Sequence, residues 1–503
     1  MTPLLDHIPH LSRADRHRPF PRAIVGEVGW NAAINLLAAG HANLFGLWGD
    51  AGAVHMALLG EGAADLVVLT LECPDGTYPS VGAKHAAAIR LERAIRSLFG
   101  IDAVGSPDTR PWLDLGFWDV SHPLGAAVIP GAPAPYPFLP VEGEGLDQIP
   151  VGPIHAGIIE PGHFRFTANG EFLVRLEERL GYVHKGIEGL MRGASIERAA
   201  MLAARTSGDS TAAYGFAFAR AVEAALGVSP PPRAIFLRAL MAELERLANH
   251  CGDIGAICND AAFALMHAQT GILRERVLRA SSVAFGHRLM RDVIVPGGVA
   301  RDIAPDGAKE CRALVAEIRR VFPGLIALYE ETASLQDRTV TTGIVKPAYA
   351  KEFGAGGHVG RASGRDFDAR KNLAYAPYDV LDFSVPVLEA GDVDARVWIR
   401  IREVEQSLSL VEQILDRLPA SDVRVPLPEA AEICEGLAVV EAFRGDLLVW
   451  LRLDPGHTVA RCHLRDASWF QWPLLEVAVE GNIVADFPLC NKSFNCSYSG
   501  HDL

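Results

Sequence analysis

The sequence predicts an α+β protein built from two units, a small α/β unit followed by a mainly helical unit with small β elements. Apolar, strand-like segments at 53–59 and 64–71 precede a segment with helical periodicity at 84–99. Beyond residue 230, apolar residues recur at alternating spacings of three and four over long stretches, which is typical of amphipathic helices. A stretch rich in proline and glycine separates the two patterns.

This proline-rich stretch sets the predicted domain boundaries. We expect an α/β unit over 1–130, a linker over 131–151 and the larger unit over 152–503. The larger unit is expected to begin with short strands. Its predicted elements are strands at 163–167 and 171–176, helices at 234–258, 272–290, 307–331 and 393–418, and a strand pair over 446–464.

Polar residues in the second unit add two expectations about the interior. Glu243, Arg246, His250 and Asp253 form a polar stripe along the helix expected at 234–258, and we interpret it as a solvated or subunit-facing helix face. A second set is interpreted as a buried, fully paired polar network, and it consists of Asp337, Arg361, Asp368 and Arg370.

Composition excludes several classes of protein. The 503 residues are 49% hydrophobic and 21% charged, which is typical of a folded chain rather than a disordered one. No apolar run reaches the length of a membrane span. The net charge of -14 argues against nucleic-acid binding. The eight cysteines form no C-x-x-C pair, and no secretory signal precedes residue 22, so we expect a cytoplasmic protein with free thiols.

Two segments carry the most specific pattern. Lys185-Gly186-Ile187-Glu188 is followed by sixteen residues and then by Arg205-Thr206-Ser207-Gly208-Asp209-Ser210. Near the end, Asn495-Cys496-Ser497-Tyr498-Ser499-Gly500 has the spacing of a D-P-C-x-x-C motif. These segments resemble the two metal motifs of nickel–iron hydrogenase large subunits, in which R-G-x-E and R-x-C-G-x-C stand sixteen residues apart.

The resemblance implies that this chain keeps the framework of a metal site but lacks the cysteine thiolates that would bind the metal. The four cysteine positions hold Ser207, Ser210, Ser497 and Gly500. Nickel in soft coordination needs deprotonated sulfur, which a serine hydroxyl does not replace at neutral pH. We therefore expect no metal bound by this chain and no hydrogen chemistry.

A wider resemblance covers residues 26–503. The second unit is similar to large subunits of the formate-hydrogenlyase (energy-converting) group and to the D-type subunit of NADH–quinone oxidoreductase (complex I). The first unit is similar to the C-type subunit of that enzyme. The segments that carry this second similarity are Tyr78-Pro79-Ser80, Glu92-Arg93, Leu98-Phe99-Gly100-Ile101, Pro107-Asp108-Thr109-Arg110-Pro111 and His122-Pro123-Leu124.

The resemblance implies catalytic roles for Glu188, His184 and Arg205. Glu188 matches the proton-path carboxylate of hydrogenases. His184 precedes it by four residues, so we expect both on one helix face, with the pKa of Glu188 raised by burial. Arg205 is expected to face the former metal cavity and to stabilise a reduced cluster or a quinone anion. The alternative for Glu188 and His184 is an exposed helix pair of little consequence. The alternative for Arg205 is a buried structural ion pair.

The resemblance also implies a quinone or cavity-lining site at His155, His163, Ser207 and Asp209. Histidines there are suited to hydrogen-bond a quinone carbonyl and deliver a proton; the alternative is that they fix a turn. The tyrosine that binds the quinone headgroup in complex I has no counterpart, because Gly208 stands near that position.

The expected function is that of a subunit in a complex I-like or hydrogenase-like membrane-associated oxidoreductase, peripheral on the cytoplasmic face of the membrane. Electrons would pass from an iron–sulfur cluster of a small partner subunit to a quinone or another acceptor, and the hetero-oligomer would include antiporter-like membrane subunits. NAD would bind only to another subunit, because no glycine-rich dinucleotide motif follows a strand. The alternative is a non-redox scaffold that assembles ion-translocating subunits.

Overall fold

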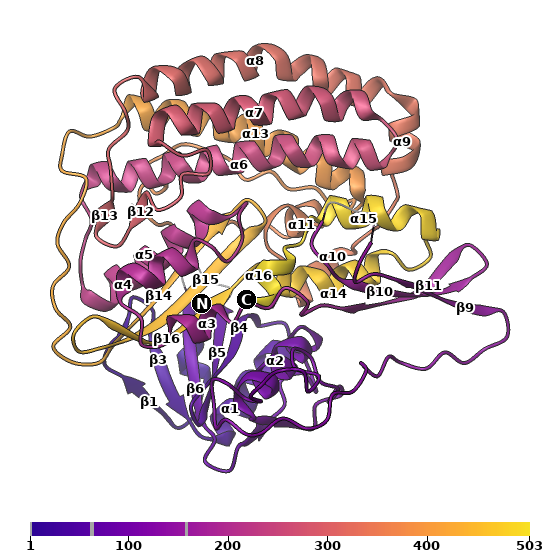
Figure 1. Cartoon of the computed structure of the whole chain (residues 1–503), viewed down its shortest axis with the longest axis vertical. Coiled ribbons are helices and arrows are strands. Elements are labelled where there is room, and N and C mark those ends of the chain that lie inside the picture. The colour runs from indigo at the N-terminus through magenta and orange to yellow at the C-terminus, as the bar shows by residue number, and fades with distance from the viewer. Residues whose placement is uncertain (1–2, 61–64, 156–158) are drawn as a thin grey trace.

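The computed structural model describes residues 3–60, 65–155 and 159–503, and it has three layers (Figure 1). A layer of long helices lies at the top of the view, a sheet of the second unit lies in the middle, and the N-terminal unit lies below. Both chain ends marked in Figure 1 lie near the boundary between the lower two layers. The predicted α+β class therefore agrees with the mixture of helices and sheets.

The N-terminal unit is a five-stranded sheet with two helices. The sheet has the order β1-β3-β6-β5-β4, in which only β3 and β6 are parallel neighbours. Helix α2 ends where Gly100 adopts a left-handed φ of 70°, a conformation that glycine adopts readily at a helix C-terminus. The elements are β1 (Leu11–Ala14), β3 (Arg22–Val25), α1 (Glu27–Ala38), β4 (Ala42–Asp50), β5 (Ala53–Gly60), β6 (Leu66–Glu72), α2 (Ile89–Phe99), and the parallel pair β7 (Thr77–Pro79) and β8 (Asp102–Val104).

The middle layer joins the two units. The predicted strand pair near the end is present as β15 (Gly445–Asp454) and β16 (Thr458–Arg465), beside β14 (Cys434–Ala442). The fourth strand of this sheet is β2 (His17–Arg18), which pairs with β14 in parallel. Because β2 comes from the first twenty residues, the start of the chain is part of the second unit's sheet.

The helical layer agrees with the predicted amphipathic segments. Its long helices are α6 (Pro232–Asp260), α7 (Ala264–Phe285), α8 (Gly307–Glu331) and α13 (Val393–Asp416). Helix α5 (Thr211–Leu226) packs between this layer and the sheet. The remaining helices are α3 (Ile187–Met191), α4 (Ile196–Ala203), α9 (Ala333–Thr339), α10 (Pro347–Glu352), α11 (Gly357–Ala362), α12 (Ala369–Asn372), α14 (Ser468–Ala478), α15 (Phe487–Phe494) and α16 (Tyr498–Asp502).

The predicted linker is partly a strand. Residues Leu146–Val151 form β9, which pairs with β10 (His163–Asn169), and β10 pairs with β11 (Phe172–Arg179). This three-stranded sheet projects to the right in Figure 1. The linker prediction was wrong for 146–151, because Pro150 can occupy an edge strand, where it needs no ladder hydrogen bond on its outer side.

The polar stripe on α6 is buried, so its interpretation as a solvated face was wrong. Glu243 and His250 are both 0% exposed, because α5, α7, α13 and α15 pack against α6. The stripe is paired inside the protein: Glu243 contacts Arg370, and His250 contacts Glu403. Arg361 and Asp368 belong to the same buried network as predicted, whereas Asp337 is exposed.

The two units share one hydrophobic core. A continuous cluster of buried apolar side chains runs from Leu4 to Leu503 and includes residues of both sheets and of the helical layer. Among the described residues, no helix combines the length and apolar character needed to cross a bilayer.

Candidate functional site

The positions expected to have lost their metal ligands lie together. The Ser207 hydroxyl donates to Asp209 (Oγ–Oδ1 2.6 Å), and the Ser497 hydroxyl donates to Ser207 (Oγ–Oγ 3.3 Å). The Ser210 hydroxyl also donates to Asp209, at 3.2 Å. The two motifs, almost 300 residues apart in sequence, therefore form one buried cluster. We call Ser207, Asp209, Ser210, Ser497 and Arg444 the serine cluster.

Arg444 supplies the cation of the serine cluster. It follows β14 in the turn to β15, and its guanidinium donates to both Asp209 oxygens, at 2.9 and 2.5 Å. It also donates to Ser210 Oγ (3.1 Å) and to the Asn495 carbonyl (2.5 Å). Burial alone would raise the pKa of Asp209, but Arg444 and the serine hydroxyls lower it to about 2. Asp209 is therefore a carboxylate at neutral pH, neutralised by a buried guanidinium.

The serine cluster does not fit a nickel–iron centre. Three of its ligand positions carry hydroxyls, and the fourth, Gly500, has no space for a thiol, because a Cβ there would lie 2.7 Å from Asp466 Oδ2. That carboxylate is itself held by the Tyr214 hydroxyl, at 2.9 Å. A guanidinium at hydrogen-bonding distance from two residues of the cluster would in addition repel a cation.

Glu188 is buried in an ionised state, which corrects the expected rise of its pKa. Its carboxylate pairs with Arg461 (2.9 Å) and His463 (2.7 Å) and accepts the Leu464 N–H (3.1 Å). Burial raises the pKa of Glu188, but Arg461 and His463 outweigh burial and lower it to about 2. A group with this pKa holds a fixed negative charge at neutral pH and is poorly suited to exchange protons there.

We expect Glu188→Gln to weaken stability in a pH-dependent way. The pKa of the carboxyl is about 2 in the folded protein and 4.5 in the unfolded chain, so its ionisation stabilises the fold above about pH 4.5. The wild type should therefore exceed the variant by roughly 3 kcal/mol at pH 7, and this difference should vanish as pH falls from 4.5 towards 2. Urea unfolding across that range measures it. Glu412→Gln, at an exposed ion pair, should show no such pH dependence. If the free energy of unfolding followed pH in the same way in the wild type and in both variants, the lowered pKa of Glu188 would be contradicted.

His184 does not share a helix face with Glu188. Helix α3 begins at Ile187, and Gly186 before it has a left-handed φ of 67°, so the helical spacing does not reach back to His184. The His184 Nδ1 hydrogen-bonds the Asp502 carbonyl (2.6 Å), and its ring stacks on Trp118. The expected His184–Glu188 pair was therefore wrong, because the glycine ends the helical periodicity.

Arg205 lies outside the cavity that it was expected to face. Its guanidinium forms a bidentate pair with Asp292 (2.7 Å to each oxygen), and both side chains are about a third or more exposed. The placement expected from the resemblance was wrong, because the R-x-S-G-x-S segment turns its serines inward and its arginine outward. The inward cation is Arg444, which sequence reasoning missed because it lies far from both motifs.

Of the two histidines expected at a quinone site, His163 has contacts that define its position. His163, on β10, is buried against Phe138, and its Nδ1 hydrogen-bonds the Gly152 carbonyl (3.0 Å), as in the turn-fixing alternative. Burial lowers the pKa of His163, which favours its neutral form. His155 is partly buried, next to residues 156–158, which fall outside the described residues.

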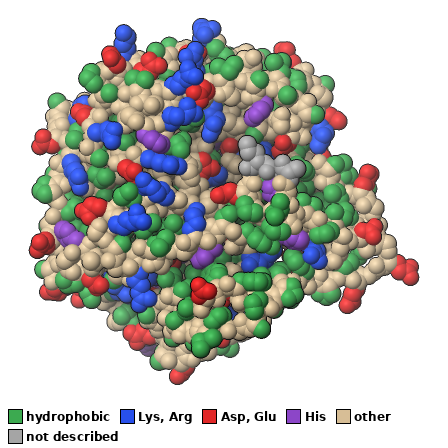
Figure 2. Space-filling view, in the orientation of Figure 1, with side chains coloured by type: hydrophobic (Ala, Val, Ile, Leu, Met, Phe, Trp, Pro, Cys, Tyr) green, Lys and Arg blue, Asp and Glu red, His purple; other side chains and the backbone are tan. Residues whose placement is uncertain are grey.

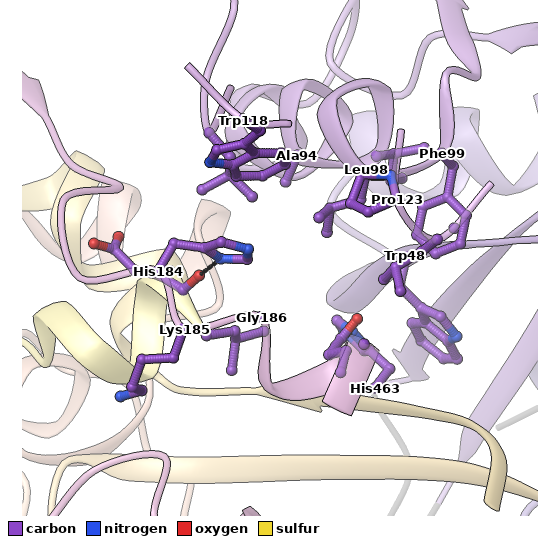
Figure 3. A pocket seen from close by; sticks show the side chains of 18 of the residues that line it. Trp48, Ala94, Leu98, Phe99, Trp118, Pro123, His184, Lys185, Gly186 and His463 are labelled. Atoms are coloured by element: carbon purple, nitrogen blue, oxygen red, sulfur yellow. Dashed lines mark hydrogen bonds and ion pairs between the residues drawn. The ribbon is translucent and has the colours of Figure 1, made fainter. Parts of the chain in front are cut away.

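A cavity of about 620 Å³ opens between the two units (Figure 3). Helix α2, β4 and the segment 113–124 line one side, and the other side is formed by the segment 184–190, β16, Trp469 and the C-terminal residues Asp502 and Leu503. His184 and Glu188 both line this cavity, although they do not share a helix face. No group of three or more His, Cys, Asp or Glu side chains among the described residues is arranged to hold a metal ion.

Comparison with known proteins agrees with the family resemblance. Residues 261–435 match the family "Respiratory-chain NADH dehydrogenase, 49 Kd subunit". Formate hydrogenlyase subunit 5 of Escherichia coli is 31% identical over 436 residues, which cover 84% of this chain and 77% of that protein. A D-type subunit of NADH-quinone oxidoreductase from a Roseiflexus strain is 31% identical, covering 67% of this chain and 94% of that protein.

A solved structure extends the similarity to the fold. A chain of the membrane-bound sulfane sulfur reductase, an archaeal respiratory membrane complex, superposes with a TM-score of 0.68 at 27% identity. The match covers 73% of this chain and all of that chain. The three serines of the serine cluster, Asp209 and Glu188 lie in the segments that resemble hydrogenase motifs, and the relatives are hydrogenase and NADH–quinone oxidoreductase subunits. The chain therefore belongs to the family of oxidoreductase subunits that includes the large subunits of formate-hydrogenlyase-type hydrogenases and the D-type subunits of NADH–quinone oxidoreductase.

Proposed function

We propose that this chain is a nickel-free electron-transfer subunit of a complex I-like or hydrogenase-like oxidoreductase. The observation that carries the proposal is the Arg444–Asp209 ion pair within the serine cluster. A site built for nickel would present thiolates at these positions, whereas this one presents hydroxyls, a glycine and a paired guanidinium. The site is therefore suited to hold fixed charge and hydrogen bonds rather than a redox metal.

In this proposal the electrons come from outside the chain. A small partner subunit would carry an iron–sulfur cluster next to the second unit, and a quinone or another acceptor would take the electrons. The complex would sit on the cytoplasmic face of the membrane, beside antiporter-like membrane subunits. Support comes from relatives named as subunits of formate hydrogenlyase, membrane-bound hydrogenase and NADH-quinone oxidoreductase. Any NADH would be bound by another subunit.

A second candidate function is a non-redox scaffold. The same ion pair favours it, because a buried, fully paired arginine closes the former metal site to a ligand. In that case the chain would assemble or couple ion-translocating subunits and pass no electrons.

Metal analysis and spectroscopy of the purified complex separate these functions. We expect nickel far below stoichiometric amounts, an iron–sulfur signal in electron paramagnetic resonance after reduction with dithionite, and loss of that signal when a short-chain quinone is added. Persistence of the reduced signal with quinone and with other acceptors would favour the scaffold. Stoichiometric nickel would contradict both functions.

A further inference from the structure

The three-stranded sheet that projects from the molecule has one covered edge and one open edge. On the covered side, the segment 481–484 runs along β11: the Leu173 N–H donates to the Asn482 carbonyl and the Gly481 N–H donates to the Leu173 carbonyl, both at 2.8 Å. On the other side, no strand among the described residues pairs with β9 beyond its ladder to β10. Five of the six residues of β9 are exposed, all except the half-buried Leu146. The free side of β9, which we call the open edge, can therefore pair with another chain.

The open edge belongs to a sheet that is packed on the body of the protein. Phe164 and Phe166 of β10 contact Phe487 of α15, with ring centroids 4.9 and 4.8 Å apart. In the ladder, Val151 lies opposite Phe164 and Ile149 lies opposite Phe166, so these side chains share one face. The two phenylalanines of β10 are at most 2% exposed, whereas both side chains of β9 are 36% exposed. One apolar face therefore continues from the core to the open edge, where a further strand would bury it.

The open edge is also acidic. The sequence has no lysine or arginine between Arg110 and Arg165, a stretch that contains all of β9. Four exposed carboxylates lie in β9 and in the loops at one end of the sheet, and none of them forms an ion pair within the described part of the chain: Glu142, Glu144, Asp147 and Glu171. Figure 2 shows acidic side chains along the right-hand side of the view, where the sheet projects. This edge therefore attracts cationic groups.

The charge of the open edge decides between its possible occupants. A second copy of this chain, paired edge to edge through β9, would bring the same carboxylates together, and like charges opposite each other in a ladder are destabilising. A segment that carries lysine or arginine avoids this repulsion, and it matches the apolar face if every second side chain is apolar. Pro150 has no N–H to donate, so we expect the pairing to follow residues 146–149.

We propose that the open edge binds an extended, basic segment of a partner subunit, which adds a fourth strand to this sheet. Main-chain hydrogen bonds along 146–149 supply the pairing, alternate apolar side chains of the partner pack beside Ile149, and its cations face the four carboxylates. This surface involves none of the residues of the serine cluster. The proposal does not depend on which proposed function is correct, because the electron-transfer subunit and the scaffold both assemble with partner chains.

Fluorescence anisotropy of a labelled decapeptide, in which valine alternates with lysine, tests the proposal on the full chain purified without partners. We expect saturable binding that weakens at least about tenfold between about 0.05 and about 0.5 M NaCl, because salt screens exposed charges. A decapeptide of alternating valine and glutamate should bind at least about tenfold more weakly than the lysine peptide. Absence of saturable binding of the lysine peptide, or equal affinity for the two peptides, would overturn the proposal.

Backbone methylation separates strand pairing from attraction between charges. Two forms of the lysine peptide carry N-methyl groups on alternate residues, one form on the valines and the other on the lysines, and both keep every side-chain charge. Because alternate N–H groups point to opposite edges of a strand, at least one form should bind about tenfold more weakly than the unmethylated peptide. Equal affinity of all three peptides would show that charge alone holds them, which would overturn the added strand.

A charge reversal with a matched control locates the binding surface. Glu144→Lys/Asp147→Lys should bind the lysine peptide at least about tenfold more weakly and should prefer the glutamate peptide. Glu330→Lys/Glu331→Lys makes the same change at two exposed positions at the end of α8 and should bind like the wild type. Equal effects of the two double variants would overturn the assignment to β9.

Cross-linking extends the test to the assembled complex. A photoreactive amino acid in place of Gln148, an exposed residue of β9, should link to a partner segment in which lysine and arginine outnumber the acidic residues. A link to a second copy of this chain, or to an acidic segment, would overturn the proposal.

Discussion

Replacing Arg444 by methionine is expected to lower the free energy of unfolding by about 1–3 kcal/mol, because the change leaves a carboxylate that is about a third exposed without its buried partner. Asp209 is ionised at neutral pH mainly because Arg444 outweighs its burial. Methionine keeps much of the side-chain volume, so the loss reports on the charge rather than on a void. Urea unfolding monitored by fluorescence measures the change.

The double variant Arg444→Met/Asp209→Asn separates charge pairing from packing. It removes both members of the pair, so it should recover most of the stability lost in the single variant. Arg205→Met is the matched control, because Arg205 forms an ion pair of similar geometry with Asp292 at the surface. Its expected cost is about 0–1 kcal/mol. Equal losses in Arg444→Met and Arg205→Met would contradict a structural role for the buried pair.

Replacing Arg361 by leucine is expected to have the largest effect on folding. The Arg361 guanidinium donates to Glu403 (2.9 and 2.6 Å) and to Glu441 (2.9 Å), and all three side chains are at most 1% exposed. Its loss leaves two buried acidic groups without their main cation, at a cost of about 3–5 kcal/mol. We expect little folded protein, measured as the yield of soluble chain and its resistance to proteolysis.

The control for Arg361→Leu lies in the same helical layer. Arg319 on α8 pairs with Glu412 on α13, and both side chains are more than 40% exposed. Arg319→Leu should change the free energy of unfolding by less than about 1 kcal/mol. Normal yield and protease resistance for Arg361→Leu would show that the buried network can be neutralised without loss of the fold.

Several elements could be predicted from local sequence alone. The long helices and the β15–β16 pair follow from apolar periodicity and from a turn at Asp454-Pro455-Gly456. The convergence of Ser207 and Ser497 was implied by the resemblance to two metal motifs, and the structure brings their hydroxyls to 3.3 Å.

Other features could not be predicted, because they depend on what packs on each face. Periodicity marked the polar stripe of α6 but could not say that α13 would cover it and bring Glu403 to His250. The short strand β2 carries no signal of its own, since its partner β14 lies more than 400 residues later.

The sequence by itself determined the family, the α+β class and the loss of thiolates from the metal motifs, because these features depend only on residue types and on their spacing along the chain. Only the tertiary structure decided that the carboxyl groups of Asp209 and Glu188 are ionised. Contacts between distant segments place Arg444 on Asp209 and Arg461 with His463 on Glu188. Burial would keep such carboxyls protonated, and the arginines and hydrogen-bond donors brought by folding keep them ionised. The same folding encloses the cavity between the two units, whose walls come from opposite ends of the chain.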